Sequence, residues 1–213
     1  MGLKPKGHLH AISSGTQSME EVIDIVKVIH PYADVIHLRE KSWTDHDWVT
    51  AIDQLRDASV PIEKICINHR VDIAALKDVK RVQLGYQSVP VGMVKDRFPH
   101  LKVGASVHNL QEAEEAFRQG ADYLLYGNIY PTSSKPGKPG AGISKLEEMA
   151  HAFPVPTIAL GGVTTERVRE IVSVGAHGIA VLSGIFLSQD PEESARKYQE
   201  ALQREVDPLG ETI

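Results

Sequence analysis

Short apolar segments and amphipathic segments alternate along almost the whole chain at near-regular spacing. The amphipathic segments carry apolar residues three and four positions apart, which is the period of a helix. In residues 19–29, for example, Val22, Ile25, Val26 and Ile29 fall on one stripe. Alternation of this kind predicts parallel strands joined by right-handed helical crossovers. The eight predicted strands are residues 8–12, 34–38, 64–68, 81–84, 102–106, 123–126, 157–160 and 178–182.

Eight strand–helix units close most economically as a (β/α)8 TIM barrel, which is an α/β fold. The chain has 213 residues, enough for one well-buried core and too few for two ordinary domains, so residues 1–213 are predicted to form a single domain. A doubly wound open sheet is the alternative, but it normally uses fewer strands and carries a glycine-rich turn after the first one. Because no G-x-G-x-x-G pattern follows residues 8–12, the barrel is preferred.

Two helix starts are marked by capping residues. Asn109 is followed three residues later by Glu112, which predicts a capping box, and Gly120 is placed to end that helix. Asp190 precedes Pro191, which predicts the cap and first residue of the last helix.

Composition excludes several classes of partner. The chain carries 23 Lys and Arg against 28 Asp and Glu, a net charge of −5, which argues against nucleic acid as a partner. No apolar run approaches the roughly 18 residues of a membrane-spanning helix, so no membrane partner is expected. The single cysteine, Cys66, lies in an apolar run and cannot form an internal disulfide, which fits a reducing compartment. These features predict a cytoplasmic protein in which Cys66 is a buried small hydrophobic residue.

Two glycine turns follow the last two predicted strands. They read Leu160-Gly161-Gly162-Val163 and Leu182-Ser183-Gly184-Ile185, and each precedes a segment that can open a helix. Glycine lets a ligand approach backbone N–H groups, and a TIM barrel commonly binds phosphate after strands seven and eight. The alternative is that these glycines only permit tight turns. Because both turns occur together, we predict a phosphate site formed by Gly161, Gly162, Ser183 and Gly184.

The second predicted strand ends in two cations. Alternation along a strand places residues 37, 39 and 41 on one side, toward the lumen and its mouth. Arg39 and Lys41 would there suit a phosphate or carboxylate, and an Arg–Glu ion-pair layer is the alternative. The glycine- and proline-rich stretch 131–142 is either a lid or a plain surface connection, and as a lid it would offer ligand contacts from Thr132, Ser134 and Lys135.

Three histidines fall at predicted strand ends facing the mouth: His37, His69 and His108. Each is a candidate general acid or base near neutral pH, and a structural or solvated role is the alternative for each. No histidine or cysteine cluster has zinc-ligand spacing, and no nucleophile elbow is present.

Taken together, the chain resembles the thiamine phosphate synthase/TenI superfamily of small (β/α)8 barrels. The resemblance runs from about residue 8 to the last helix. It implies a small phosphorylated thiazole as substrate and a possible homodimer. The landmarks that carry it are His37-Leu-Arg39-Glu-Lys41, Asn68 with Val71-Asp72, Ser106-Val-His108, Gly127 followed by Pro131-Thr132-Ser-Ser134-Lys135, Ala159-Leu-Gly161-Gly162 and Val181-Leu-Ser183-Gly184.

The synthases of this superfamily join a pyrimidine pyrophosphate to a thiazole phosphate and need Mg²⁺. The resemblance places two metal-binding carboxylates there, one directly after the strand-three Asn and one in the turn after strand four. In this chain the first position is His69 and the turn reads Gly85-Tyr86-Gln87-Ser88, so both acids are absent. Loss of two anionic oxygen donors should remove most of the affinity for a metal–pyrophosphate. The residues that match synthase substrate positions are Arg39, Lys41, Asn68, Ser106, Thr132 and Lys135.

The TenI branch of the superfamily contains a thiazole tautomerase, which moves a proton without a metal. We therefore predict a thiazole tautomerase, an isomerase, with no cofactor and no metal. The histidine that serves characterised tautomerases after strand six is Asn128 here, and Asn cannot exchange a proton near neutral pH. The predicted base is then His69, with His37 or His108 next and Asn128 orienting the ring. The alternatives are a thiamine phosphate synthase and a non-catalytic binding or regulatory protein.

Overall fold

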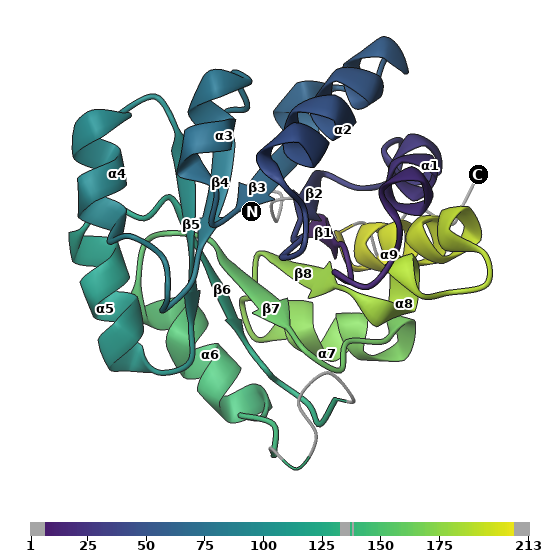
Figure 1. Ribbon diagram of the computed structural model, residues 1–213. Helices are drawn as coiled ribbons and strands as arrows, with labels where there is room; N and C mark the ends of the chain where they lie inside the picture. The colour runs from purple at the N-terminus through teal and green to yellow at the C-terminus, as the bar shows by residue number, and fades with distance from the viewer. Residues whose placement is uncertain (1–6, 133–136, 138, 207–213) are drawn as a thin grey trace.

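Eight parallel strands close into a barrel in the order β1 to β8, with β8 pairing back to β1 (Figure 1). The computed structural model describes residues 7–132, 137 and 139–206. The strands are β1 (His8–Ile12), β2 (Val35–Leu38), β3 (Ile65–Asn68), β4 (Arg81–Leu84), β5 (Lys102–Val107), β6 (Tyr123–Gly127), β7 (Thr157–Leu160) and β8 (Gly178–Val181).

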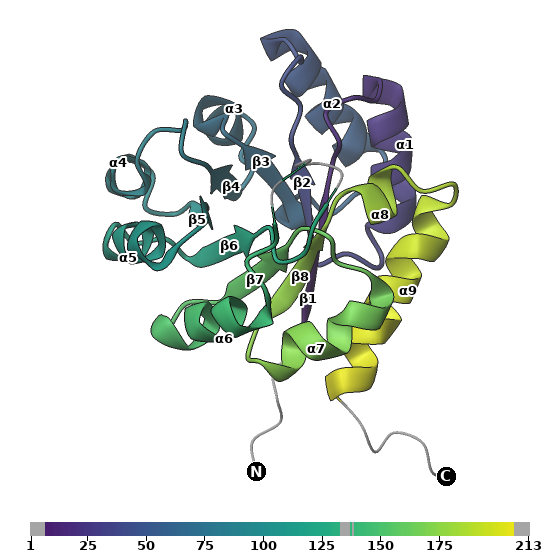
Figure 2. The same cartoon turned by 90° about the horizontal axis from the view of Figure 1, so that it is seen from below.

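Helices follow the strands and surround the barrel (Figure 2). Short 3₁₀ turns η1 (Ile62–Lys64) and η2 (Thr165–Arg167) precede β3 and α7. The helices are α1 (Met19–Ile29), α2 (Asp45–Asp57), α3 (Val71–Leu76), α4 (Val91–Arg97), α5 (Leu110–Arg118), α6 (Ile143–Ala152), α7 (Val168–Ser173), α8 (Ser183–Phe186) and α9 (Pro191–Val206).

The predicted (β/α)8 barrel is confirmed, with strand bounds that shift by one residue at five ends. One shift has a local cause at the start of β2. The Asp34 carboxylate accepts the Leu9 amide hydrogen at 2.9 Å, so the side chain takes a bond that a strand backbone would normally accept. The strand therefore begins at Val35 rather than at Asp34.

Both predicted helix caps are present. Asn109 Oδ1 accepts from the Glu112 amide at 2.9 Å, and Asp190 Oδ1 accepts from the Glu193 amide at 2.9 Å. The second hydrogen bond of the predicted capping box, from the Asn109 backbone amide to the Glu112 side chain, is replaced by others. The Glu112 carboxylate accepts from the His108 amide at 2.8 Å and from Asn109 Nδ2, which ties the helix start to the end of β5. Gly120, at φ +89°, follows the end of α5 as predicted.

Apolar side chains form two buried clusters. The larger one lies between the strands and the helices and includes Trp48, which is 1% exposed. The smaller one comes from β1 and β6 to β8 and fills one side of the lumen; it consists of Ile12, Tyr123, Leu125, Ile158 and Ala180. Within the described part of the chain, no helix is long and apolar enough to cross a membrane.

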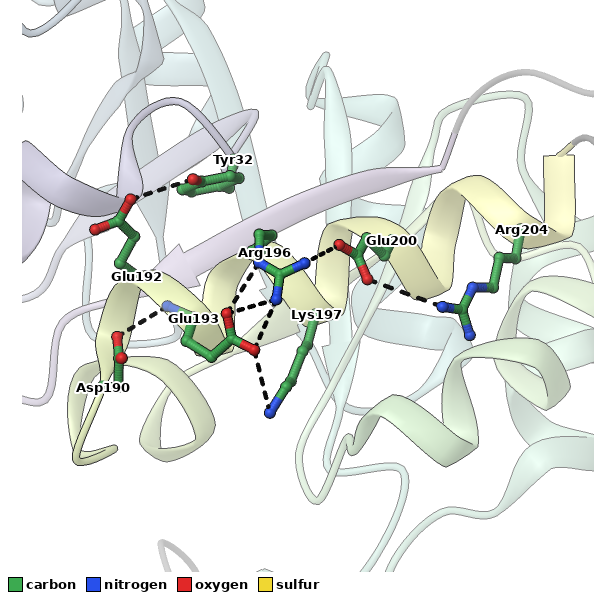
Figure 3. A network of polar contacts seen from close by, with 8 residues as sticks. All are labelled: Tyr32, Asp190, Glu192, Glu193, Arg196, Lys197, Glu200 and Arg204. Carbon is green, nitrogen blue, oxygen red and sulfur yellow. Dashed lines mark hydrogen bonds and ion pairs between the residues drawn. The ribbon is translucent and has the colours of Figure 1, made fainter.

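Helix α9 covers β1 and packs beside α1 and α7. Its outer face carries a chain of ion pairs in which Arg196 bonds to Glu193 and Glu200 (Figure 3). Tyr32 Oη donates to Glu192 at 3.2 Å and joins the segment before β2 to this helix. Exposed pairs of this kind contribute little to stability. The buried face of α9 supplies most of the attachment, through Ala195, Tyr198 and Leu202.

Candidate active site

A cavity of about 600 Å³ opens where the strands end and the βα loops begin. This is the end of a TIM barrel at which active sites are found. A second hollow of about 560 Å³ lies outside the barrel beside α4 and α5. We assign the candidate site to the first, because it lies over the lumen and collects residues from all eight βα units. The predicted site residues that line it are Arg39, Lys41, Asn68, His69, Ser106, His108, Asn128, Thr132, Gly161, Gly162, Ser183 and Gly184.

The floor of this cavity has a polar side and an apolar side. Asn68, Gln83 and Ser106 lie on β3, β4 and β5, and Gln83 Nε2 donates to Ser106 Oγ at 3.0 Å. The opposite side is formed by apolar residues of β1 and β6 to β8, among them Leu125 and Leu160. A flat heterocycle fits such a floor, because its faces can contact the apolar side while its ring nitrogens meet hydrogen-bonding groups.

Two buried histidines lie beneath Asn68. His37 Nδ1 is 3.3 Å from Asn68 Oδ1, and His37 Nε2 is 2.9 Å from His10 Nδ1. Because an amide oxygen only accepts, His37 donates from Nδ1 and its Nε2 accepts from His10. Burial lowers the pKa of His37 to about 4 and holds the pKa of His10 well below its usual value. Both rings are therefore neutral at physiological pH, and together they fix the orientation of the Asn68 amide.

The placement of His37 differs from the expectation that it faces the mouth. It is fully buried in the lumen and does not line the cavity. His10 was not among the residues expected to matter. Its only sequence signal is a polar residue at an alternate position of an otherwise apolar strand. Alternation along the strand predicts on which face His10 lies, but not how deep in the barrel it lies.

Cys66 lies in the same lumen and is fully buried, as predicted. Its sulfur is 3.6 Å from the Tyr123 hydroxyl. Burial raises the pKa of the Cys66 thiol to about 12, so the thiol stays protonated and is no nucleophile.

Cationic and imidazole side chains gather over β2 and β3. Arg39 and Lys41 line the cavity beyond the end of β2, and the Arg39 amide donates to Ser13 Oγ at 2.8 Å. His69 follows β3 with φ +67°, and its Nδ1 lies 2.5 Å from Ser88 Oγ. Loss of hydration, and then the charges of Arg39 and Lys41, lower the pKa of His69. This part of the site is positively charged and suits an anion.

Over β5 and β6 the mouth carries polar groups held by their neighbours. His108 Nδ1 is 3.1 Å from a Glu112 carboxylate oxygen, an ion pair when the ring is protonated. Asn128 Nδ2 donates to the Tyr130 carbonyl at 3.1 Å, which fixes its amide at the cavity wall. Thr132 lines the cavity as well. Ser134 and Lys135 lie outside the described residues.

The two glycine turns form the side of the mouth over β7 and β8. Gly161 and Gly162 have φ values of +98° and +65°, a conformation that side chains rarely adopt. A Cβ at Gly162 would lie 2.7 Å from the Pro131 carbonyl oxygen, and one at Gly184 would lie 2.5 Å from the Tyr198 hydroxyl. Gly162 and Gly184 are therefore required by the packing of the turns, whether or not a ligand binds there. Ser183 is exposed at the start of α8.

The residues at the mouth do not fit the Mg²⁺ that the resemblance implies. Mg²⁺ is held by hard, preferably anionic oxygen donors. The described residues that line the cavity include no Asp and no Glu. Nor do the described residues contain a group of three or more His, Cys, Asp or Glu that could hold a metal ion. Of the carboxylates near the mouth, Glu112 is bonded to His108 and Glu40 is only 5% exposed.

Comparison with known proteins places the chain in a family. The sequence profile described as thiamine monophosphate synthase matches residues 9–185. The chain belongs to the thiamine monophosphate synthase family. It is 34% identical over 206 residues to a thiamine-phosphate synthase from Caldivirga maquilingensis, covering 92% of this chain and 97% of that protein. A second thiamine-phosphate synthase, from Pyrococcus furiosus, is 31% identical over 98% of this chain and 99% of its own length.

A solved structure agrees with these sequences. The thiamine phosphate pyrophosphorylase from Pyrococcus furiosus is similar with a TM-score of 0.79 and 28% identity, over 98% of this chain and all of that one. The superfamily expected from the sequence is confirmed. The predicted tautomerase, and with it the isomerase class, is wrong, because these relatives are named as synthases, which are transferases. The absence of two carboxylates informs on metal binding and not on the class of reaction.

Proposed function

We propose that this chain is a thiamine-phosphate synthase, which joins a pyrimidine pyrophosphate to a thiazole phosphate and releases pyrophosphate. Family membership and similarity over nearly the whole length support this assignment. The main structural support for the assignment is the layout of the cavity. A cationic wall over β2 and β3 faces a glycine-turn wall over β7 and β8, with a neutral floor between them. Two substrates that each carry phosphate need two anion-binding ends and a shared middle.

The reaction needs little acid–base catalysis by the protein. The thiazole nitrogen attacks the methylene carbon of the pyrimidine substrate, a C–N bond forms, and the C–O bond to pyrophosphate breaks. The bonding electrons leave with the pyrophosphate, so no proton moves at the reacting atoms. Catalysis then depends on aligning the two rings and on stabilising charge on the leaving group.

The residues present suit those two tasks. The thiazole phosphate binds at the turns of Gly161, Gly162, Ser183 and Gly184, where backbone N–H groups approach the ligand. The rings lie on the floor, with Asn68 and Ser106 as hydrogen-bonding partners of the pyrimidine. Arg39 and Lys41 hold the pyrophosphate and stabilise its charge as it leaves.

The direct test is to incubate the purified protein with both substrates and to follow thiamine phosphate by chromatography, together with pyrophosphate release. We expect both products in equal amounts. In Asn68→Ala the rate should fall at least about tenfold, because a pyrimidine hydrogen bond is lost. If no thiamine phosphate forms from the two substrates, either without a metal or with any added divalent cation, the assignment is refuted.

A further inference from the structure

The cavity has a charge composition that the chain as a whole does not share. The sequence carries 28 acidic residues and a net charge of −5. The described residues that line the cavity nevertheless include the cations Arg39 and Lys41 and no Asp or Glu. A pocket that concentrates positive charge on an acidic protein attracts anions and repels metal cations.

His69 is held in place by a short chain of hydrogen bonds. Gly85 N–H donates to Ser88 Oγ at 2.9 Å, and Ser88 Oγ is 2.5 Å from His69 Nδ1. With Nδ1 engaged by the serine, the ring atom left for a ligand is Nε2. When Ser88 donates its hydroxyl hydrogen to Nδ1, Nε2 carries a hydrogen and is a donor. The pair thus presents a fixed imidazole beside the cations that follow β2.

The electrostatics around His69 agree with that geometry. Arg39 and Lys41 lie near enough for their charges to lower the pKa of His69. All three side chains line the same cavity, and an arriving polyanion would offset the repulsion between the Arg39 and Lys41 charges. A divalent cation in the same region would add to the repulsion instead.

We propose that the pyrophosphate end of the substrate is bound by a cationic cradle of Arg39, Lys41 and the His69–Ser88 pair, and that this binding needs no divalent cation. The proposal rests on the proposed function for the identity of its ligand. It assigns to His69 and Ser88 the place where the related synthases are expected to hold their metal. The cradle replaces the positive charge of a metal with side-chain charge.

Calorimetric titration of the whole protein with inorganic pyrophosphate tests the proposal, once with a chelator and once with Mg²⁺. We expect binding in the chelator that Mg²⁺ does not strengthen. Lys41→Ala should weaken it about tenfold or more, because a charge-assisted contact is lost. Lys27→Ala is the matched control, since Lys27 pairs with Asp24 on the outer helix α1, and it should bind as the parent does.

A double variant tests directly whether the cradle takes the place of a metal ion. His69→Asp with Ser88→Asp supplies two carboxylates, and we expect it to bind pyrophosphate weakly in chelator and at least tenfold more tightly with Mg²⁺. Parent protein that binds pyrophosphate only with Mg²⁺, or a Lys41→Ala variant that binds as tightly as the parent, overturns the cradle. Metal-free binding without any thiamine phosphate synthesis would leave the cradle standing and refute the synthase instead.

Discussion

Acid should destabilise this protein through the histidine pair beneath the site. Burial lowers the pKa of His37 to about 4 from an ordinary 6.5. Between these two values the unfolded chain binds a proton that the folded protein does not. The free energy of unfolding therefore falls as the pH drops through 6.5, and the loss levels off below about pH 4. From about pH 7.5 to about pH 5 the linkage relation gives a loss of about 2 kcal/mol from His37.

The perturbation that isolates this term is His37→Gln. A glutamine amide offers one donor and one acceptor, as the neutral ring does toward Asn68 and His10, but it does not titrate. Denaturant unfolding curves at the two pH values should show that the variant loses about 2 kcal/mol less than the parent. His10 is shifted in the same direction, first by its own burial and then by His37, so a part of the acid response remains in the variant.

His46→Gln serves as the control, because His46 is exposed on α2. It should lose as much stability as the parent between the two pH values. A His37→Gln variant with the pH dependence of the parent would refute the reasoning, since the buried ring would then have no part in the acid response.

Three further outcomes follow from the packing. Gly162→Ala should weaken the binding of thiazole phosphate about tenfold, as measured by titration, and should lower the free energy of unfolding by about 2 kcal/mol, because the added Cβ meets Pro131. Gly142→Ala is the control. Gly142 has φ +85° and open space around the Cβ, so this variant should lower the free energy of unfolding by only about 1 kcal/mol. Asn109→Ala should lower the free energy of unfolding by about 1 kcal/mol through loss of the α5 cap, and a larger loss would indicate a role beyond capping. Trp48→Ala should cost about 3–5 kcal/mol in denaturant unfolding, and a loss below about 1 kcal/mol would contradict its burial.

The fold was predictable because its signals are local and repeated. Apolar periodicity and caps such as Asn109 and Asp190 are set by neighbours within four residues, so the elements were located to within a residue or two. The order of the strands then followed from the rule that parallel strands need crossovers. The positions of Arg39 and Gly162 at the mouth depended on that topology alone.

Depth inside the barrel and the class of reaction were not predictable in the same way. His37 lies in β2 and Arg39 follows the end of the strand two positions later, yet His37 is buried and Arg39 lines the cavity, because alternation along a strand gives a side and not a depth. The His10 contact joins residues 27 positions apart, which no local pattern encodes. The tautomerase prediction relied on single positions such as His69, whereas similarity over the whole length identified the family.

We infer that two anion-binding walls hold the two substrates over one neutral floor. A crystal structure of the protein with thiamine phosphate and pyrophosphate, grown with Mg²⁺ present, tests it most directly. We expect the ester phosphate at the turns of Gly162 and Ser183, with pyrophosphate contacted by Lys41 and His69 and no metal held by protein carboxylates. A phosphate bound elsewhere, or a divalent cation bridging pyrophosphate to a carboxylate of this chain, would contradict it.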